Sequence, residues 1–149
     1  MPQSYVSCFM HYVFSTKDRQ DWINLELRKR LYPYFGGIAK TNRMKMLTAG
    51  GTENHVHLLM SQSTVFIPKV AQLIKGGSSK WIHDTFPALK HFRWQKGYGA
   101  FSINVSHVQG TLAYIERQEE HHREVSFKEE FLSFLKKHNI AYDERYIWD

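Results

Sequence analysis

The chain has 149 residues, which suits one domain with a single sizeable core, and its content of 42% hydrophobic and 15% aromatic residues argues against disorder. A single cysteine, Cys8, excludes a disulfide framework and a cysteine-based zinc site, and makes a reducing compartment the expected setting. The formal net charge of +6 is compatible with a nucleic-acid partner, although many basic domains carry solvated lysine faces without binding nucleic acid. No apolar run approaches the roughly 18 residues of a membrane span, so a cytoplasmic protein is expected.

Hydrophobic periodicity and turn residues predict alternating strands and helices over the first 106 residues. In chain order these are a strand over 4–15, a helix over 24–40, strands over 43–51 and 55–61, a helix over 65–84 and an extended segment over 91–106. Asn24 is the expected cap of the first helix, and Pro33 predicts a kink or an early end within it. The Gly-Gly-Ser-Ser stretch at 76–79 predicts an interruption of the second helix.

Two further helices are predicted in the remaining part of the chain. One covers 106–122 and opens at Ser106, and the other covers 126–139 and opens at Ser126, with Glu129 at capping-box spacing. The order β-α-β-β-α-β predicts an α+β, ferredoxin-like split sheet with helices on one face and additional C-terminal helices. Because the sequence contains no repeat, low-complexity stretch or linker, residues 1–149 are expected to form one domain.

The segment HVHLLMS places two histidines at the start of a predicted buried strand. Side chains alternate between the faces of a strand, so His55 and His57 face outward together while Val56, Leu58 and Met60 face the core. This arrangement can present two nitrogen ligands to one metal ion. The pattern alone fits structural histidines equally well.

A candidate nucleophile lies on the helix that opens at Ser106. Tyr114 and Gln118 are four residues apart and share one face of this helix. At 100° per residue, that face lies a quarter turn or more from the helix's apolar residues, so core packing explains Tyr114 poorly. Tyr98, between two glycines, is an alternative nucleophile, although core packing or base stacking is the expected use of that residue.

Basic and aromatic side chains alternate between residues 69 and 96, where Asp84 is the only acidic residue. A single-stranded nucleic-acid surface requires positive charge for phosphates and aromatic faces for bases. The residues expected to contact DNA are Lys75, Ser78, Ser79, Lys80, Arg93, Trp94 and Lys96. A solvated helix face is the alternative for the first four. His121 and His122 could assist metal or DNA binding, but a solvated helix end is the expected setting.

Together these motifs resemble a known family, the small single-tyrosine HUH transposases of the simplest bacterial insertion sequences and their relatives associated with repetitive extragenic palindromes. ENHVHLLMS and YIERQEEHH carry the resemblance, with HYVFSTKDR, LIKGGSSKWI and WQKGYGAFSIN in the family's order. By this resemblance His55 and His57 are the histidine pair that binds a divalent ion. Tyr114 is the nucleophile and Gln118 the third metal ligand.

The resemblance implies an enzyme that cleaves and rejoins single-stranded DNA at hairpin-bearing element ends through a 5′-phosphotyrosine intermediate. The implied cofactor is Mg²⁺ or Mn²⁺. The implied partners are single-stranded DNA with a subterminal hairpin and a second copy of the chain, in a homodimer with joined sheets whose active site forms within one subunit or between two. No membrane partner and no small-molecule substrate are expected. Two alternatives stay open: a domesticated relative acting on chromosomal palindromes, and a non-catalytic single-stranded nucleic-acid-binding module.

Overall fold

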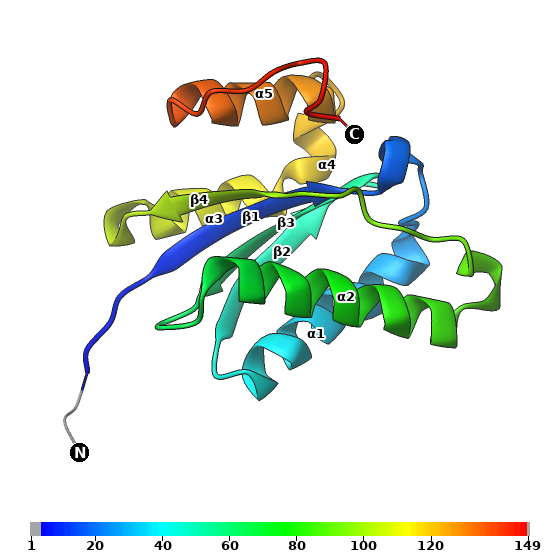
Figure 1. The fold of residues 1–149 in the computed structure, drawn as a ribbon, viewed down its shortest axis with the longest axis horizontal. Coiled ribbons are helices and arrows are strands. Elements are labelled where there is room, and N and C mark those ends of the chain that lie inside the picture. Colours follow the sequence, from blue (N-terminus) through cyan, green and yellow to red (C-terminus); the bar gives the residue numbers. More distant parts are fainter. Residues whose placement is uncertain (1–3, 149) are drawn as a thin grey trace.

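The computed structural model describes residues 4–148, which contain a four-stranded antiparallel sheet of order β2-β3-β1-β4 (Figure 1). The strands are β1 (Phe9–Ser15), β2 (Lys45–Gly51), β3 (His55–Ser61) and β4 (Gly99–Ile103). The helices are α1 (Leu25–Thr41), α2 (Ile67–Thr85), α3 (Val108–Glu116), α4 (Gln118–His121) and α5 (Phe127–Lys137). This order of elements confirms the predicted ferredoxin-like α+β fold. None of the helices in this part of the chain is long and apolar enough to cross a membrane.

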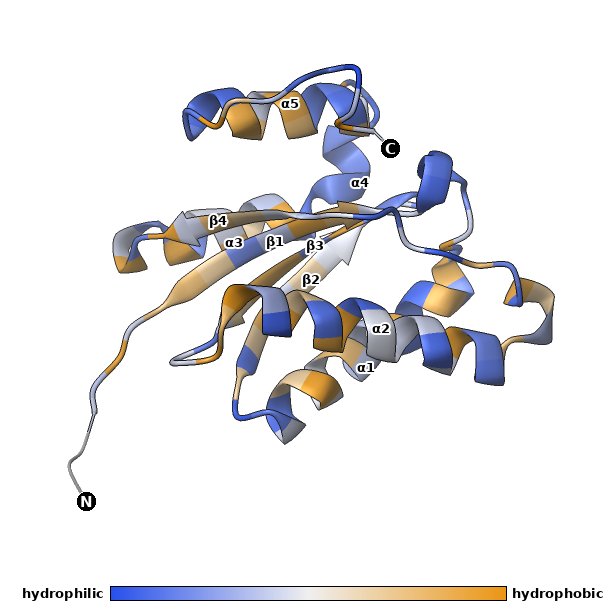
Figure 2. Cartoon of the chain, viewed as in Figure 1, coloured by the Kyte–Doolittle hydropathy of each residue, from blue (hydrophilic) through white to orange (hydrophobic). Residues whose placement is uncertain are grey.

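The sheet is covered on both faces, by α1 and α2 on one side and by α3, α4 and α5 on the other (Figure 1). Polar and apolar stretches alternate along α1, α2 and α5, as expected for helices that each bury one side (Figure 2). The larger core lies between the sheet and the first two helices. Its central side chains are Tyr12 and Phe14 of β1, Val56 and Leu58 of β3, Leu31 and Phe35 of α1, and Ile74 and Ile82 of α2.

A smaller core lies on the opposite face of the sheet, beneath α5. Val13 of β1 and Phe101 of β4 contact Phe127 and Leu135 of α5 there. Helix α5 begins at a complete capping box, in which the side chain of Ser126 and the third helical residue satisfy each other's backbone N–H groups. This confirms the predicted helix start and fixes the position of α5 over the sheet.

Several predicted boundaries differ from the observed ones. Strand β1 begins at Phe9 rather than at residue 4, and residues 4–7 are exposed. Helix α1 passes through Pro33 without a break, because Pro33 is on the exposed side while Leu31 and Phe35 stay in the core. Helix α2 likewise continues through 76–79, where Ser78 is buried on the same side as the core residues of the helix.

The predicted helix over 106–122 is divided into α3 and α4. Ser106 is not its cap, because α3 begins at Val108 and the Ser106 backbone N–H donates to the side chain of Asn104. The chain leaves helical geometry at Arg117, with φ −101° and ψ 18°. Helix α4 then runs toward α5 (Figure 1), and this change of direction brings Gln118 to the face of the sheet that carries the histidines.

Candidate active site

Strand β3 presents both histidines of the HVH segment on the face opposite the larger core. The predicted alternation is observed, since Val56 and Leu58 belong to that core while His55 and His57 face α5. The two histidines do not face solvent, however. Each is 0% exposed, because α4 and α5 cover this part of the sheet. The two side chains share one face of the strand, as predicted, but the expectation that this face points outward is wrong. The pair lies in a closed site.

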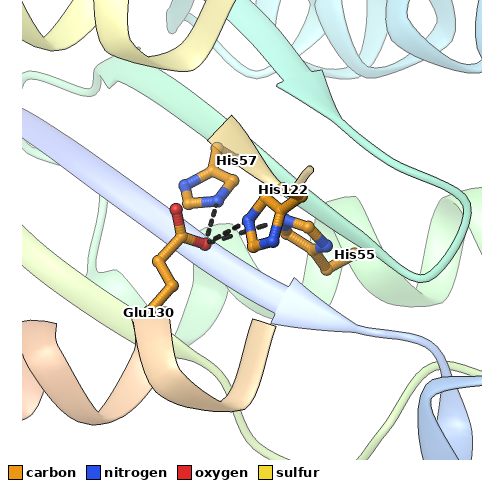
Figure 3. Close-up of side chains that lie close together, drawn as sticks. All are labelled: His55, His57, His122 and Glu130. Carbon is orange, nitrogen blue, oxygen red and sulfur yellow. Dashed lines mark hydrogen bonds and ion pairs between the residues drawn. The ribbon is translucent and has the colours of Figure 1, made fainter. Parts of the chain in front are cut away.

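Glu130 of α5 points into the histidines of this site (Figure 3). Its Oε1 atom lies 2.9 Å from His57 Nε2, 3.0 Å from His122 Nε2 and 3.6 Å from His55 Nε2. The ligand atoms of these four side chains all lie within 4.8 Å of one another. We call these residues, His55, His57, His122 and Glu130, the His/Glu cluster.

The second carboxylate oxygen of Glu130 joins the cluster to the candidate nucleophile. Oε2 accepts hydrogen bonds from the phenol of Tyr114 and from Nε2 of Gln118, the latter at 3.0 Å. The amide oxygen of Gln118 lies 3.0 Å from His55 Nε2. The structure thus brings Tyr114 and Gln118 to the histidine pair within one chain, despite the helix break between them.

The rings of both strand histidines are also oriented by contacts to their Nδ1 atoms, on the side away from the cluster. Nδ1 of His57 lies 2.7 Å from Nε2 of His11, a buried residue of β1 that is its diagonal neighbour across the strands. Nδ1 of His55 lies 2.8 Å from the side-chain oxygen of Asn54, which accepts a hydrogen bond from it. Each contact leaves the Nε2 atom directed into the cluster, as second-shell hydrogen bonds do for metal-ligating histidines.

Burial sets the protonation of the site. It lowers the pKa of His55 to about 3, so the imidazole is neutral and keeps a lone pair. For Glu130, burial acts to raise the pKa, but hydrogen bonds from His122 and His57 hold the pKa below its ordinary value, so the carboxylate is ionised. Burial, together with the hydrogen bond to Glu130, raises the pKa of Tyr114, so its phenol is protonated at neutral pH.

The residues present fit a divalent metal ion. Metal ligands must be neutral imidazoles and ionised carboxylates, which is the state of His55 and Glu130. Donor atoms about 2.1 Å from one ion stand roughly 3.0 to 3.5 Å apart. The distances from Glu130 Oε1 to the three Nε2 atoms, 2.9 Å, 3.0 Å and 3.6 Å, are close to this spacing. The cluster therefore has both the chemistry and the dimensions of a metal site.

Comparison with known proteins identifies the family. The family described as "Transposase IS200 like" matches residues 4–118 of the chain. The chain belongs to the IS200-like transposases. The match includes the HVH segment and Tyr114 and ends at Gln118, so the resemblance inferred from the sequence is confirmed.

The solved structures that resemble this IS200-like transposase include two other transposases. A candidate transposase from Deinococcus radiodurans R1 is 25% identical, with a TM-score of 0.65, and the match covers 79% of this chain and 96% of that one. A REP-associated tyrosine transposase bound to a REP hairpin is 13% identical, with a TM-score of 0.57 and coverage of 77% and 68%, and shows the shared fold alone. Comparison with curated protein sequences gives no significant match.

Two members of the His/Glu cluster of this IS200-like transposase, His122 and Glu130, are not assigned to the site by the sequence motifs, although metal binding is an alternative role for His122. His122 was expected at a solvated helix end, yet its side chain is only 8% exposed. No sequence motif marks Glu130 as a site residue. One signal could have found it: Glu130 lies three residues after Phe127 and four before Phe134, on the apolar side of an amphipathic helix. A carboxylate in that position needs a buried partner.

The predicted DNA contacts of the transposase divide into two groups. Ser78 and Trp94 are buried and hydrogen bond to each other at 2.9 Å, so neither side chain can reach DNA. Lys75 donates to the carbonyls of Gln95 at 2.7 Å and Gly97 at 2.6 Å, and burial lowers its pKa to about 8. These three residues support the segment before β4. Of the predicted set, Lys80, Arg93 and Lys96 are exposed, and Ser79 is partly exposed, as Lys75 is.

Proposed function

We propose that this IS200-like transposase cleaves and rejoins single-stranded DNA through attack of Tyr114 on a scissile phosphodiester. The observation that carries the proposal is the Glu130 carboxylate, which contacts the phenol of Tyr114 with one oxygen and the strand histidines with the other. A non-catalytic nucleic-acid-binding module has no use for this arrangement of a tyrosine, a carboxylate and buried imidazoles.

Tyr114 must lose a proton before its oxygen can bond to phosphorus. An ordinary phenol, with a pKa near 10, is largely protonated at neutral pH, and here burial and Glu130 raise the pKa of Tyr114 further. Because Glu130 Oε2 already accepts the phenolic hydrogen bond, it takes the proton as the oxygen–phosphorus bond forms. The phosphorus bond to the 3′ oxygen breaks, and that oxygen takes a proton from water and leaves as a free 3′-OH.

The remaining residues bind and orient. His55, His57 and Gln118 are proposed to hold a divalent ion, Mg²⁺ or Mn²⁺, which would polarise the scissile phosphate and offset its developing charge. The energy of the broken phosphodiester bond is kept in the 5′-phosphotyrosine, so attack by another 3′-OH rejoins DNA without ATP. Next to His122 lies an open pocket of about 480 Å³, lined also by Asn54 and Arg123, through which DNA would reach the site.

The proposed substrate is single-stranded DNA with a hairpin. The related REP-associated tyrosine transposase is described as bound to a REP hairpin, and the two proteins share their fold. On this chain the exposed side chains of Lys80 on α2, and of Arg93 and Lys96 in the segment before β4, are proposed to contact backbone phosphates.

A covalent-adduct assay tests the function. Tyr114→Phe removes the nucleophilic oxygen but keeps the ring, so we expect no protein–DNA adduct and no cleavage of a labelled hairpin oligonucleotide on denaturing gels, with binding retained. Tyr98→Phe is the matched control, because Tyr98 is the alternative nucleophile, and it should form the adduct. Excess EDTA should stop cleavage by the wild-type chain. Adduct formation by Tyr114→Phe at the wild-type level would exclude the proposed function.

A further inference from the structure

We propose that Glu130 and His122 join the two strand histidines as metal ligands, and that the resulting site prefers a transition-metal ion to Mg²⁺. Both residues lie beyond residues 4–118, over which the family matches, so the family match does not cover them. The role of the ion in DNA cleavage rests on the proposed function, but metal binding itself can be measured without DNA or cleavage.

The surroundings of Glu130 indicate that a cation binds next to its carboxylate. The residue is 2% exposed, and its two carboxylate oxygens contact the side chains of His57 and Gln118, which are buried as well. Within residues 4–148, the ion-pair partners of Glu130 are histidines, and no lysine or arginine side chain is among them. A buried charge without a permanent counter-charge is costly. A divalent ion among the three Nε2 atoms and Oε1 would balance it.

His122 is positioned as a ligand rather than as a solvated residue. It forms the C-cap of α4, and its ring centroid lies 4.3 Å from that of His55. Its Nε2 atom is 3.0 Å from Glu130 Oε1, the same oxygen that faces the strand histidines. Strand β3, the end of α4 and helix α5 thus each supply ligand atoms to one point. Four side chains from three elements can enclose an ion from several sides.

The donor set indicates the class of metal. Mg²⁺ prefers octahedral oxygen ligands and keeps several waters, which a buried set of three imidazoles and one carboxylate does not offer. Imidazole suits Zn²⁺ and related transition ions, and carboxylate also suits Mn²⁺. The amide oxygen of Gln118, 3.0 Å from His55 Nε2, is near enough to add a fifth ligand. We therefore expect both Zn²⁺ and Mn²⁺ to bind more tightly than Mg²⁺, and Zn²⁺ more tightly than Mn²⁺.

Titration of the metal-free full-length chain with ZnCl₂, MnCl₂ or MgCl₂ in isothermal calorimetry tests the proposal. Glu130→Gln keeps the size of the side chain but removes its charge, and His122→Ala removes one imidazole. Each variant should weaken Zn²⁺ and Mn²⁺ binding at least about tenfold, since even the loss of an outer-shell partner has effects of that size. Glu120→Gln and His107→Ala change exposed residues of the same types and should leave both affinities unchanged.

A second measurement needs no variant. Pulsed electron paramagnetic resonance of Mn²⁺ in the wild-type chain counts the coordinated imidazole nitrogens, and three are expected where the strand pair alone would give two. Wild-type affinity in Glu130→Gln and His122→Ala, two nitrogens on Mn²⁺, or Mg²⁺ binding as tight as that of Mn²⁺ would each overturn the proposal. Faster DNA cleavage by Glu130→Gln with unchanged metal affinity would also overturn it. Glu130 would then not be a metal ligand, and its carboxylate would only block the position that the scissile phosphate takes.

The two proposals fail in different ways. Tyr114→Phe keeps every atom of the His/Glu cluster and should bind Mn²⁺ as the wild-type chain does. A chain that binds metal through Glu130 but forms no adduct would contradict only the transposase chemistry. A chain that forms the adduct through Tyr114 but binds metal equally well without Glu130 would contradict only the ligand assignment.

Discussion

Buried neutral histidines are an unusual feature of this site at the scale of single residues. His11 and His55 are 2% and 0% exposed, and burial, with the nearby His57, lowers the pKa of each to about 3 from an ordinary value of 6.5. Neither side chain can take up a proton in the folded chain near neutral pH. Both become protonated below pH 6.5 once the chain unfolds and exposes them to water.

Acid should therefore destabilise the metal-free protein. Because the folded pKa of His11 and His55 is below the unfolded value, the unfolded state binds more protons, and the free energy of unfolding falls as pH drops from 6.5 toward 3. The expected slope is on the order of 1 kcal/mol per pH unit for each histidine. Urea denaturation in EDTA at a series of pH values would measure it. His11→Phe should make the slope shallower, and constant stability from about pH 6.5 to 4.5 would contradict the prediction.

At the scale of elements, the packing of α3 against β2 positions the nucleophile. A Cβ atom at Gly50 would lie 2.2 Å from the backbone oxygen of Ile115 and 2.9 Å from its Cγ2 atom. Glycine is required there because the helix backbone rests directly on the strand. Ile115 is fully buried and adjoins Tyr114, so this contact sets how far the tyrosine stands from the sheet.

Gly50→Ala should move α3 away from the sheet. The clash involves a backbone atom, which cannot rotate aside, so we expect a loss of about 1 to 3 kcal/mol in stability together with reduced adduct formation. Gly110→Ala is the matched control, because no atom lies within 4 Å of its added Cβ and alanine favours the helix by up to about 1 kcal/mol. Thermal unfolding of both variants measures the difference. Equal melting temperatures would show that α3 does not depend on Gly50.

At the scale of the whole molecule, one chain carries both halves of the candidate site. His55 and His57 come from β3, and Tyr114 and Gln118 reach them from the helices that follow in the same chain. The resemblance to dimeric transposases allowed an active site shared between subunits. This geometry favours assembly within a subunit, whether or not a homodimer with joined sheets forms.

Mixing two inactive variants distinguishes these arrangements. Tyr114→Phe lacks the nucleophile and His57→Ala lacks a strand histidine. If the site forms within one chain, an equimolar mixture should stay inactive in the adduct assay, since each chain carries one defect. Wild-type chain added to either variant is the positive control. Adduct formation by the mixture would show that Tyr114 of one chain acts at the histidines of another.

Much of the fold and half of the site could be predicted because they depend on residues close together in sequence. Period-two alternation placed His55 and His57 on one face of a strand, and helical spacing separated Tyr114 from the apolar side of its helix. The capping box located the start of α5. These patterns come from backbone geometry, which acts over a few residues wherever the segment lies in the fold.

Only the tertiary structure decided what each face contacts. Glu130 is 73 residues from His57, and no local pattern relates a carboxylate on α5 to an imidazole on β3. For the same reason Ser78 and Trp94, in a basic and aromatic segment, belong to the core and not to a DNA surface. By itself the sequence determined the family, the strand histidines and the candidate nucleophile. The packing of α4 and α5 across the sheet determined that these residues meet a buried carboxylate, because long-range contacts depend on how the elements pack.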